Sequence, residues 1–255
     1  MNTPLRDLAA AALLVLAAAV PALLPAAHAE MQAEAHGQRQ PAPAALSPGE
    51  LRTLLATMPA GEPARGERLH AEQFCASCHG AKGVAPTPNW PHVAGQRAAY
   101  TFKMLVDYQR GIRAEVERAA LMHAVTRDMA AQDMADLAAW YATLPLPHEA
   151  ETPRPKTTVA AAAVQRLVRK GDPSRLITPC ASCHGARGQG GTGDGKASPA
   201  LAGQNPRYLV RTLQQYHGDV RTNDPKRGMR AFAQRLSSAE VDALASYYAD
   251  LTAAR

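Results

Sequence analysis

The sequence is poor in aromatic residues, in strand-like patterns and in long hydrophobic runs. Phe, Trp and Tyr together make up 5% of the 255 residues. Beyond residue 24 no segment is long and apolar enough to cross a bilayer. No run of alternating apolar and polar residues predicts a strand, whereas Ala-rich segments with a helical period are frequent. These absences argue against β-rich and multiply spanning proteins, and they predict an all-α fold.

The one long apolar run lies at the start of the chain. Leu8–Leu24 follows a short polar segment that contains Arg6, and Ala27-His28-Ala29 supplies the small-residue pattern that a signal peptidase reads. Residues 1–29 are therefore predicted to be a signal peptide that is cleaved after Ala29 and directs the protein to the periplasm. The alternative is an uncleaved membrane anchor, but the run is marginal in length and prolines interrupt its end.

The four cysteines form two pairs, and a histidine follows each pair directly. The residues are Cys75, Cys78 and His79, and then Cys180, Cys183 and His184. Cys-x-x-Cys-His is the attachment sequence of c-type haem. Two thiols three residues apart on a helical turn can reach the two vinyl groups of one porphyrin, and the histidine then faces the iron. The sequence therefore predicts two covalently bound haem c groups, with His79 and His184 as proximal iron ligands.

Three other uses of the cysteines are possible. A thioredoxin-like redox pair requires a βαβ context, which a helical sequence does not offer. A zinc site requires four convergent ligands, and each cluster has three. Two disulfides would fit an exported protein but would leave both histidines unexplained.

The second half of the chain repeats the first. Cys75 and Cys180 differ by 105 positions, as do Gly66 and Gly171, and Ala94-Gly95-Gln96 recurs 108 positions later as Ala202-Gly203-Gln204. The prediction is a first cytochrome-sized domain at residues 63–145 and a second at 161–255, called here the first and second repeat. A Pro-rich linker at 146–160 joins them. Residues 30–62 form an N-terminal extension, in which Ser47 and Glu50 cap a short helix that ends near Thr57.

The second iron ligand decides whether the haem passes electrons or binds small molecules. Met229 is the only methionine after His184, and Met122 is the methionine of the first repeat that aligns with it. Met129 and Met134 align with Leu236 and Val241, which is typical of core residues. Met122 and Met229 are therefore the predicted distal ligands. His123 is the rival in the first repeat.

The haem motifs, the distal methionines and the closing aromatic helices resemble class I cytochromes c. The duplication, Ala-Gly-Gln-x-x-x-Tyr and the ending Ala-x-Tyr-Tyr-Ala resemble cytochrome c4 in particular, over about Ala64–Leu144 and Arg169–Leu251. This resemblance implies two tandem four-helix domains about a pseudo-twofold axis, with haem propionates near their interface. It further implies that the carbonyls of Pro91 and Pro199 hold the proximal histidines. Gln96, Gln204, Tyr100 and Tyr208 would lie near the propionates or the domain junction. Residues 86–92 depart from the Gly-rich family pattern, which the second repeat keeps.

The resemblance implies a protein that transfers electrons and is not an enzyme. Its redox partners would be a quinol-oxidising complex or a dehydrogenase as donor and a terminal oxidase as acceptor, with peripheral membrane association possible. A second hypothesis is the cytochrome subunit of a periplasmic dehydrogenase, such as a flavin-linked sulfide-oxidising complex. A third is a haem enzyme with a labile distal ligand. The low aromatic content of an exported haem protein argues against nucleic acid as a partner.

The charge of +6 is unevenly distributed. Residues 30–150 hold 11 Lys and Arg against 13 Asp and Glu, whereas residues 151–255 hold 16 against 8. Arg221, Lys226, Arg227 and Arg230 lie around Met229 in the sequence. They predict either a solvated face or a docking patch for an acidic redox partner.

Overall fold

The computed structural model describes residues 42–115, 117–147, 153–191 and 197–251. The predicted signal peptide lies outside these ranges, as do parts of the extension and of the linker. Within them the chain forms helices and no strand beyond an isolated bridge between Asp172 and Ile177, which confirms the all-α prediction. None of the helices in these ranges has the length and apolar character of a membrane span.

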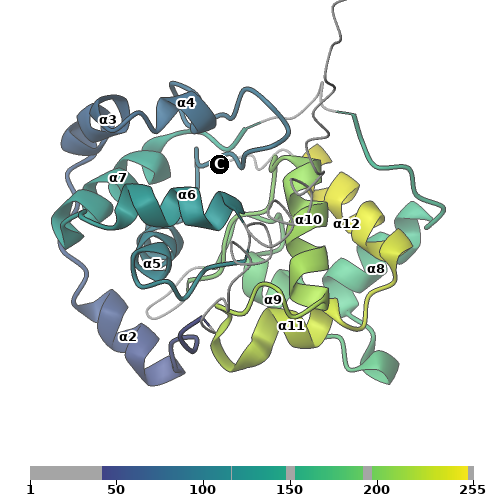
Figure 1. Ribbon diagram of the computed structural model, residues 1–255. Coiled ribbons are helices and arrows are strands. Elements are labelled where there is room, and N and C mark those ends of the chain that lie inside the picture. Colours follow the sequence, from purple (N-terminus) through teal and green to yellow (C-terminus); the bar gives the residue numbers. More distant parts are fainter. Residues whose placement is uncertain (1–41, 116, 148–152, 192–196, 252–255) are drawn as a thin grey trace, which may run out of the picture. The chain divides into compact units, whose positions relative to one another are not determined.

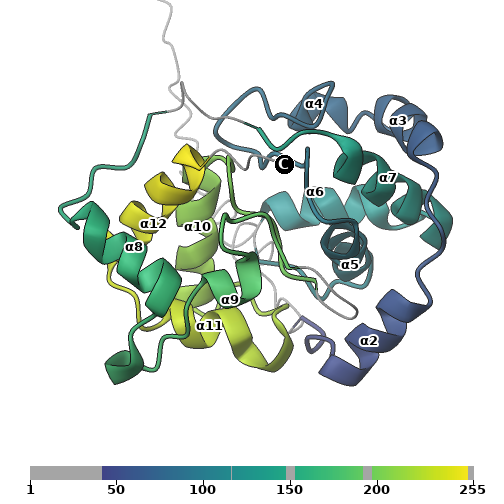
Figure 2. The ribbon, with the colours of Figure 1, turned by 180° about the vertical axis from the view of Figure 1, so that it is seen from behind.

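The helices of each repeat gather in a group of their own (Figures 1 and 2). Helix α2 (Pro48–Ala56) precedes the first repeat, which contains α3 (Pro63–Glu72), α4 (Ala76–His79), α5 (Ala98–Gln109), α6 (Glu117–Thr126) and α7 (Ala131–Thr143). The second repeat contains α8 (Ala161–Lys170), α9 (Ala181–His184), α10 (Pro206–His217), α11 (Gly228–Ala233) and α12 (Ser238–Asp250). Two 3₁₀ turns, at Pro173–Arg175 and Pro225–Arg227, lie between these helices.

Two predicted helix starts are present with their capping boxes. Ser47 and Glu50 exchange backbone-to-side-chain hydrogen bonds of 2.7 and 3.2 Å at the start of α2. Ser237 and Glu240 do the same at the start of α12, at 2.9 and 3.2 Å. Each box satisfies two backbone N–H groups that the first turn of a helix leaves unpaired.

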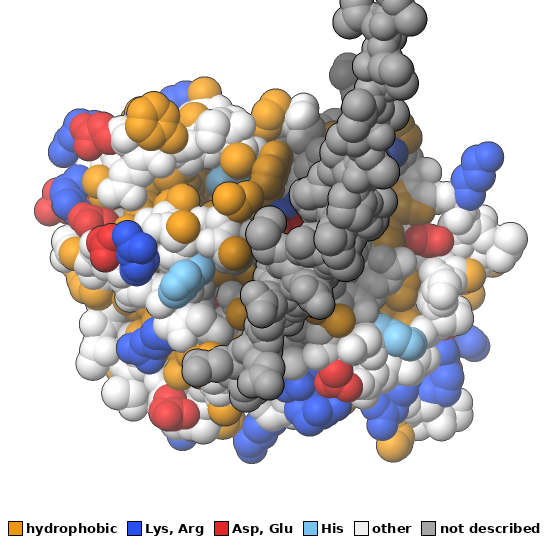
Figure 3. All heavy atoms as spheres, viewed as in Figure 1, with side chains coloured by type: hydrophobic (Ala, Val, Ile, Leu, Met, Phe, Trp, Pro, Cys, Tyr) orange, Lys and Arg blue, Asp and Glu red, His pale blue; other side chains and the backbone are white. Residues whose placement is uncertain are grey.

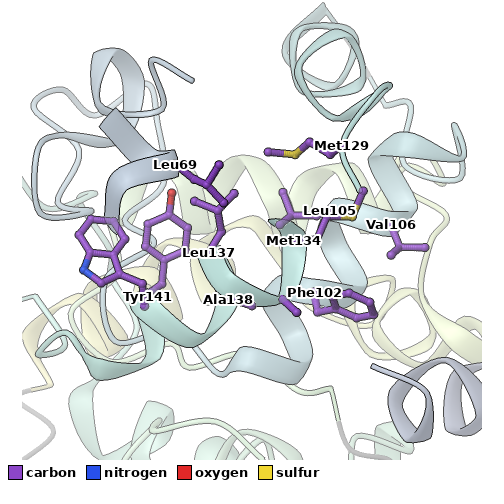
Figure 4. Packing of buried hydrophobic residues seen from close by; sticks show 11 residues of the cluster. Leu69, Phe102, Leu105, Val106, Met129, Met134, Leu137, Ala138 and Tyr141 are labelled. Atoms are coloured by element: carbon purple, nitrogen blue, oxygen red, sulfur yellow. The ribbon is translucent and has the colours of Figure 1, made fainter. Parts of the chain in front are cut away.

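One apolar face of the last helix builds the core of each repeat. In the first repeat Met134, Leu137, Ala138 and Tyr141 of α7 pack with Met129 and with residues of α5 (Figure 4). In the second repeat Val241, Leu244, Ala245 and Tyr248 of α12 take the same role. Met129 and Met134 are thus buried core residues, as their alignment with Leu236 and Val241 predicts.

The pairing of Gly66 with Gly171 is wrong as a structural equivalence. Gly66 lies inside α3 where this helix crosses α7, and a Cβ there would lie 2.1 Å from the carbonyl oxygen of Asp136. Gly171 instead ends α8 with φ of +68°. The two glycines differ because the segment Asp172–Ile177, closed by its bridge, separates α8 from the second haem motif.

Gly66→Ala is expected to destabilise the protein by about 1–3 kcal/mol or more, because the added methyl group forces α3 away from the backbone of α7. Urea unfolding of the holoprotein, followed by circular dichroism, measures the change. Gly49→Ala is the matched control, since the nearest atom to its Cβ lies 3.9 Å away. In α2 the alanine should leave stability unchanged or raise it. Equal stability of Gly66→Ala and the native chain would refute the close crossing.

Candidate functional site

Each Cys-Ala-Ser-Cys-His motif forms a one-turn helix of its own. In α4 the N–H of His79 donates to the carbonyl of Cys75 at 3.0 Å, and in α9 His184 donates to Cys180 at the same distance. This turn places both thiols and the histidine of a motif on one short helical segment. None of the four cysteines is in a disulfide.

The structure does not favour the other uses of the cysteines. The described part of the chain contains no βαβ unit and no group of three or more His, Cys, Asp or Glu residues that could hold a metal ion. No disulfide joins the four sulfurs. The described residues therefore contain none of the arrangements that the thioredoxin-like, zinc and disulfide hypotheses require.

The two histidines of the motifs are held in one defined tautomer. Nδ1 of His79 lies 3.0 Å from the carbonyl oxygen of Pro91, and Nδ1 of His184 lies 3.0 Å from that of Pro199. Because a carbonyl only accepts, Nδ1 carries the proton and Nε2 keeps its lone pair for a metal. Burial lowers the pKa of both imidazoles, which favours the neutral, ligating form. The implied roles of Pro91 and Pro199 are confirmed.

Both motifs open onto one mostly apolar cavity of about 610 Å³. The predicted distal ligands Met122 of α6 and Met229 of α11 line this cavity together with His79 and His184. His123 is not among the lining residues; its Nδ1 lies 2.7 Å from the carbonyl of Tyr108. The geometry therefore favours Met122 over its rival.

Met104 also lines the cavity but its sulfur is already engaged. It accepts hydrogen bonds of 3.4–3.5 Å from Arg113, Arg221 and Asn223. A thioether shared among three donors is a poor candidate for an iron ligand, and Met104 instead belongs to a polar cluster at the domain junction.

Two buried arginines form this cluster with pseudo-twofold symmetry. The guanidinium of Arg113 lies over the ring of Tyr108 and donates to Glu115 at 2.7 Å. The guanidinium of Arg221 lies over Tyr216 and donates to Asn223 at 2.9 Å. Sequence reasoning missed this pair as a functional feature.

The repeat itself could have revealed the arginine pair. The three positions of one half recur 108 residues later in the other: Tyr108 and Tyr216, Arg113 and Arg221, Glu115 and Asn223. Each arginine also reaches a tyrosine of the other repeat. Arg221 donates to the hydroxyl of Tyr100 at 3.3 Å, and Arg113 donates to Tyr208.

The two arginines of the cluster act together on Tyr208. Burial raises the pKa of Tyr208, but the charges of Arg113 and Arg221 and the hydrogen bond from Arg113 outweigh it and lower the pKa to about 7. Arg221 is 2% exposed and donates to Asn223, Tyr100 and Met104, which are all uncharged. A buried cation among neutral acceptors favours an anionic group beside it.

The repeated Ala-Gly-Gln turns tie the two repeats together. Gly95 and Gly203 have φ of +68° and +67°. A Cβ on Gly203 would lie 1.8 Å from the carbonyl of Pro147. The glutamines that follow cross the junction, where Gln96 bonds to the backbone of Ala200 and Gln204 to that of His92. The expected placement of Gln96, Gln204 and Tyr100 at the domain junction is confirmed.

The Cytochrome c family matches this sequence twice, over residues 63–145 and 174–252. The chain belongs to the cytochrome c family. It is similar to cytochrome c4 of Thiocapsa roseopersicina, with 35% identity over 75% of this chain and 94% of that protein. It is also 32% identical to a thiosulfate dehydrogenase electron acceptor of Stutzerimonas stutzeri, over 71% of this chain and 80% of that protein.

A solved structure agrees with these relatives. The crystal structure of reduced recombinant cytochrome c4 from Pseudomonas stutzeri superimposes with a TM-score of 0.61 at 29% identity, covering 75% of this chain and 100% of that chain. The protein is thus a dihaem cytochrome c4-like protein with tandem class I cytochrome c domains, two covalently bound haem c groups and a role in electron transfer.

The cavity of this cytochrome fits two haem groups by its chemistry. Its apolar walls suit the faces of a porphyrin, and the cysteines and histidines of both attachment motifs line the cavity. The arginine and tyrosine cluster at the junction offers cations and hydroxyl donors to propionate groups, whose negative charge would balance Arg221. This arrangement agrees with propionates near the domain interface, as the resemblance implies.

The predicted docking patch around Met229 is wrong for two of its four residues. Arg221 points into the junction, and Arg230 is 9% exposed and pairs with Asp224 at 2.7 Å. Arg227 is exposed but pairs with Asp219 at 3.0 Å. In Figure 3 the basic side chains gather on the lower part of the face, near α11, with acidic side chains among them. Arg227 and Arg230 therefore pair with carboxylates of the segment that leads into α11, the helix that carries Met229.

A buried ion pair adds a second link across the junction. Lys103 and Asp107, one turn apart on α5, form a salt bridge with side chains that are 4% and 0% exposed. Lys103 also donates to the carbonyl of Asn223 at 2.7 Å, and the side chain of Asn223 donates to Asp107. Burial lowers the pKa of Lys103 and raises that of Asp107, and the attraction between the two groups opposes both shifts.

Lys103→Met is expected to cost about 3–5 kcal/mol, because it leaves the Asp107 carboxylate buried without its cation. The double variant Lys103→Met with Asp107→Leu should recover most of this loss, as measured by urea unfolding. Arg211→Met, at the equivalent position of the second repeat, is the control and should cost less than about 1 kcal/mol. A double variant as unstable as the sum of its single variants would contradict the pairing.

Proposed function

We propose that this cytochrome carries single electrons between redox proteins of the periplasm and delivers them toward a terminal oxidase. One observation carries the proposal. In each repeat a neutral histidine of fixed tautomer and a methionine line the same apolar cavity as the attachment motif. Such a site suits an iron that has a protein ligand on each side. An iron held in this way can change its oxidation state without exchanging a ligand.

The residues in this proposal have separate roles. The thioether links would form at Cys75, Cys78, Cys180 and Cys183, and the iron ligands would be His79 and Met122, then His184 and Met229. A haem bound there supplies one-electron chemistry, and a methionine opposite histidine favours the ferrous form and raises the reduction potential. Tyr100, Tyr208, Arg113 and Arg221 would hold the propionates.

The segments that carry the two methionines are anchored locally. In α6 the hydroxyl of Thr126 donates to the carbonyl of Met122 at 2.9 Å. In α11 the backbone N–H of Arg230, next to Met229, donates to Asp224 at 2.9 Å, and the Arg230 side chain donates to the same carboxylate at 2.7 Å. Anchored ligands keep the geometry similar in both oxidation states, which suits electron transfer better than catalysis by a labile iron.

The location also belongs to the proposal. The N-terminal segment is typical of a signal peptide, which supports export to the periplasm and cleavage after Ala29. The use of all four cysteines in haem motifs fits this location. In this reading residues 63–145 and 161–255 are the two haem domains, and residues 146–160 are their linker.

A second candidate is the cytochrome partner of a periplasmic dehydrogenase. The relative from Stutzerimonas stutzeri is named a thiosulfate dehydrogenase electron acceptor, and a protein of the same name from Thiomonas intermedia is 32% identical. These names favour thiosulfate oxidation over flavin-linked sulfide oxidation as the source of electrons. The two candidates differ in the donor and share the same haem chemistry.

Met122→Ala is expected to convert one haem to the high-spin state and to lower its potential, because the iron loses its thioether ligand. Electronic spectra and a redox titration of the holoprotein measure both effects, and the other haem should keep its spectrum. His123→Ala is the matched control from the neighbouring position and should leave both haems low-spin. A high-spin haem in His123→Ala, with a native spectrum in Met122→Ala, would reverse the assignment.

Electron delivery can be followed with purified, reduced holoprotein. Membranes of the source organism that contain its terminal oxidase should oxidise both haems, and cyanide should stop the reaction because it blocks the oxidase. Thiosulfate with a thiosulfate dehydrogenase is the parallel assay for reduction of the oxidised protein. If the membranes do not oxidise the reduced cytochrome and the dehydrogenase rapidly reduces the oxidised one, the second candidate function is favoured over the first.

A further inference from the structure

The peptide groups that hold the two proximal histidines have a second hydrogen bond at their other end. The carbonyl of the Pro91–His92 peptide accepts from His79 at 3.0 Å, and the N–H of the same peptide donates to Oε1 of Gln204 at 2.9 Å. Pro91 and His92 belong to the first repeat, whereas Gln204 belongs to the second. The acceptor therefore comes from the opposite repeat.

The second haem site has the equivalent arrangement with the two repeats exchanged. The carbonyl of the Pro199–Ala200 peptide accepts from His184 at 3.0 Å, and its N–H donates to Oε1 of Gln96 at 2.7 Å. Each repeat thus supplies the glutamine that completes the histidine support of the other. The exchange follows the pseudo-twofold relation of the repeats.

The glutamine amides are fixed and largely shielded from water. Gln204 and Gln96 are 6% and 7% exposed. Nε2 of Gln204 donates to the carbonyl of His92 at 2.9 Å, and Nε2 of Gln96 donates to that of Ala200 at 3.2 Å. Since a carbonyl can only accept and a backbone N–H only donate, these bonds determine which amide atom is oxygen.

A peptide that donates through its N–H becomes a stronger acceptor at its carbonyl, because hydrogen bonds in a chain polarise one another. A stronger acceptor draws the Nδ1 proton of the histidine and makes Nε2 more basic toward the metal. A more basic ligand stabilises ferric over ferrous iron and so lowers the reduction potential.

We propose that Gln96 and Gln204 are positioning residues that lower the reduction potential of the haem in the opposite repeat, through the Pro–X peptide that supports its proximal histidine. The inference rests on the proposed ligation by His79 and His184. It gives the domain junction a redox function in addition to its structural one.

By thermodynamic linkage, the oxidation state of the iron must in turn affect the strength of the hydrogen bonds to the glutamine. An oxidised iron makes the Nδ1 proton of its histidine more acidic, which strengthens the chain of hydrogen bonds that ends at the glutamine. The junction is therefore tighter in the oxidised protein than in the reduced one. Loosening the junction raises both potentials.

Gln204→Leu tests the proposal in the holoprotein. It should raise the potential of the haem bound at His79 and leave that of the haem at His184 unchanged. The expected size is a roughly threefold change in the ferric-to-ferrous ratio at fixed applied potential, which is about 28 mV for a one-electron couple. A redox titration followed by NMR, with the Met122 and Met229 methyl signals assigned, separates the two haems. Gln96→Leu is the matched variant and should raise only the potential of the haem at His184.

Gln204→Glu separates the acceptor function from packing. The carboxylate keeps an oxygen for the N–H of His92, so the potential of the haem at His79 should stay at or below its native value. This variant and Gln96→Leu carry the test if Gln204→Leu does not fold.

Three outcomes would overturn the inference: unchanged potentials in both Leu variants, a shift of the haem in the glutamine's own repeat, or a rise in Gln204→Glu equal to that in Gln204→Leu. Low-spin spectra in these variants would show that ligation itself is intact. A failure of this inference is thereby distinguished from a failure of the proposed function.

Discussion

The hydrogen bond from each proximal histidine to a prolyl carbonyl is the constraint on which the rest of the site depends. In both repeats it fixes the proton on Nδ1 and leaves Nε2 free to bind iron. Proline suits the acceptor position because its rigid φ holds the carbonyl in place. The same peptide then presents its N–H to the other repeat. One local bond thus sets both the metal-binding form of the histidine and the contact surface of the domain.

The junction follows from this constraint. A peptide buried between two domains must have both its donor and its acceptor satisfied, and here Gln96 and Gln204 satisfy the N–H groups. The chain at Leu146 and Pro147 can pass close to the Ala-Gly-Gln turns because Gly95 and Gly203 lack a Cβ. Separating the repeats would expose two such peptides, together with the polar cluster around Arg113 and Arg221. The pairing of the repeats is therefore part of each haem site.

Much of this arrangement is readable from the sequence, because haem attachment depends on spacing along the chain. The motifs, the duplication, the apolar faces of the last helices and the choice of Met122 over Met129 all follow from local spacing or alignment. The burial of charged side chains does not follow from local spacing. Arg221 and Arg230 read as a basic surface run, but they lie inside because their partners come from residues such as Tyr100 and Asp224. Alignment by spacing also fails for Gly171. It lies 105 positions after Gly66, like the cysteines, but the turn that follows α8 places it at the end of that helix, whereas Gly66 lies inside α3.

The symmetry of the two sites is incomplete, and the differences are electrostatic. Each repeat offers the same set of attachment residues, histidine, prolyl carbonyl and methionine. Around them, the first repeat buries Lys103, Asp107 and Glu115, where the equivalent positions of the second hold Arg211, Gln215 and Asn223. Charges in a buried site act over longer distances than charges in water, because the interior screens them poorly. With the proposed ligands equal in both repeats, this difference in surrounding charge would give the two irons unequal reduction potentials. Such a difference would favour one direction of electron transfer along the pair.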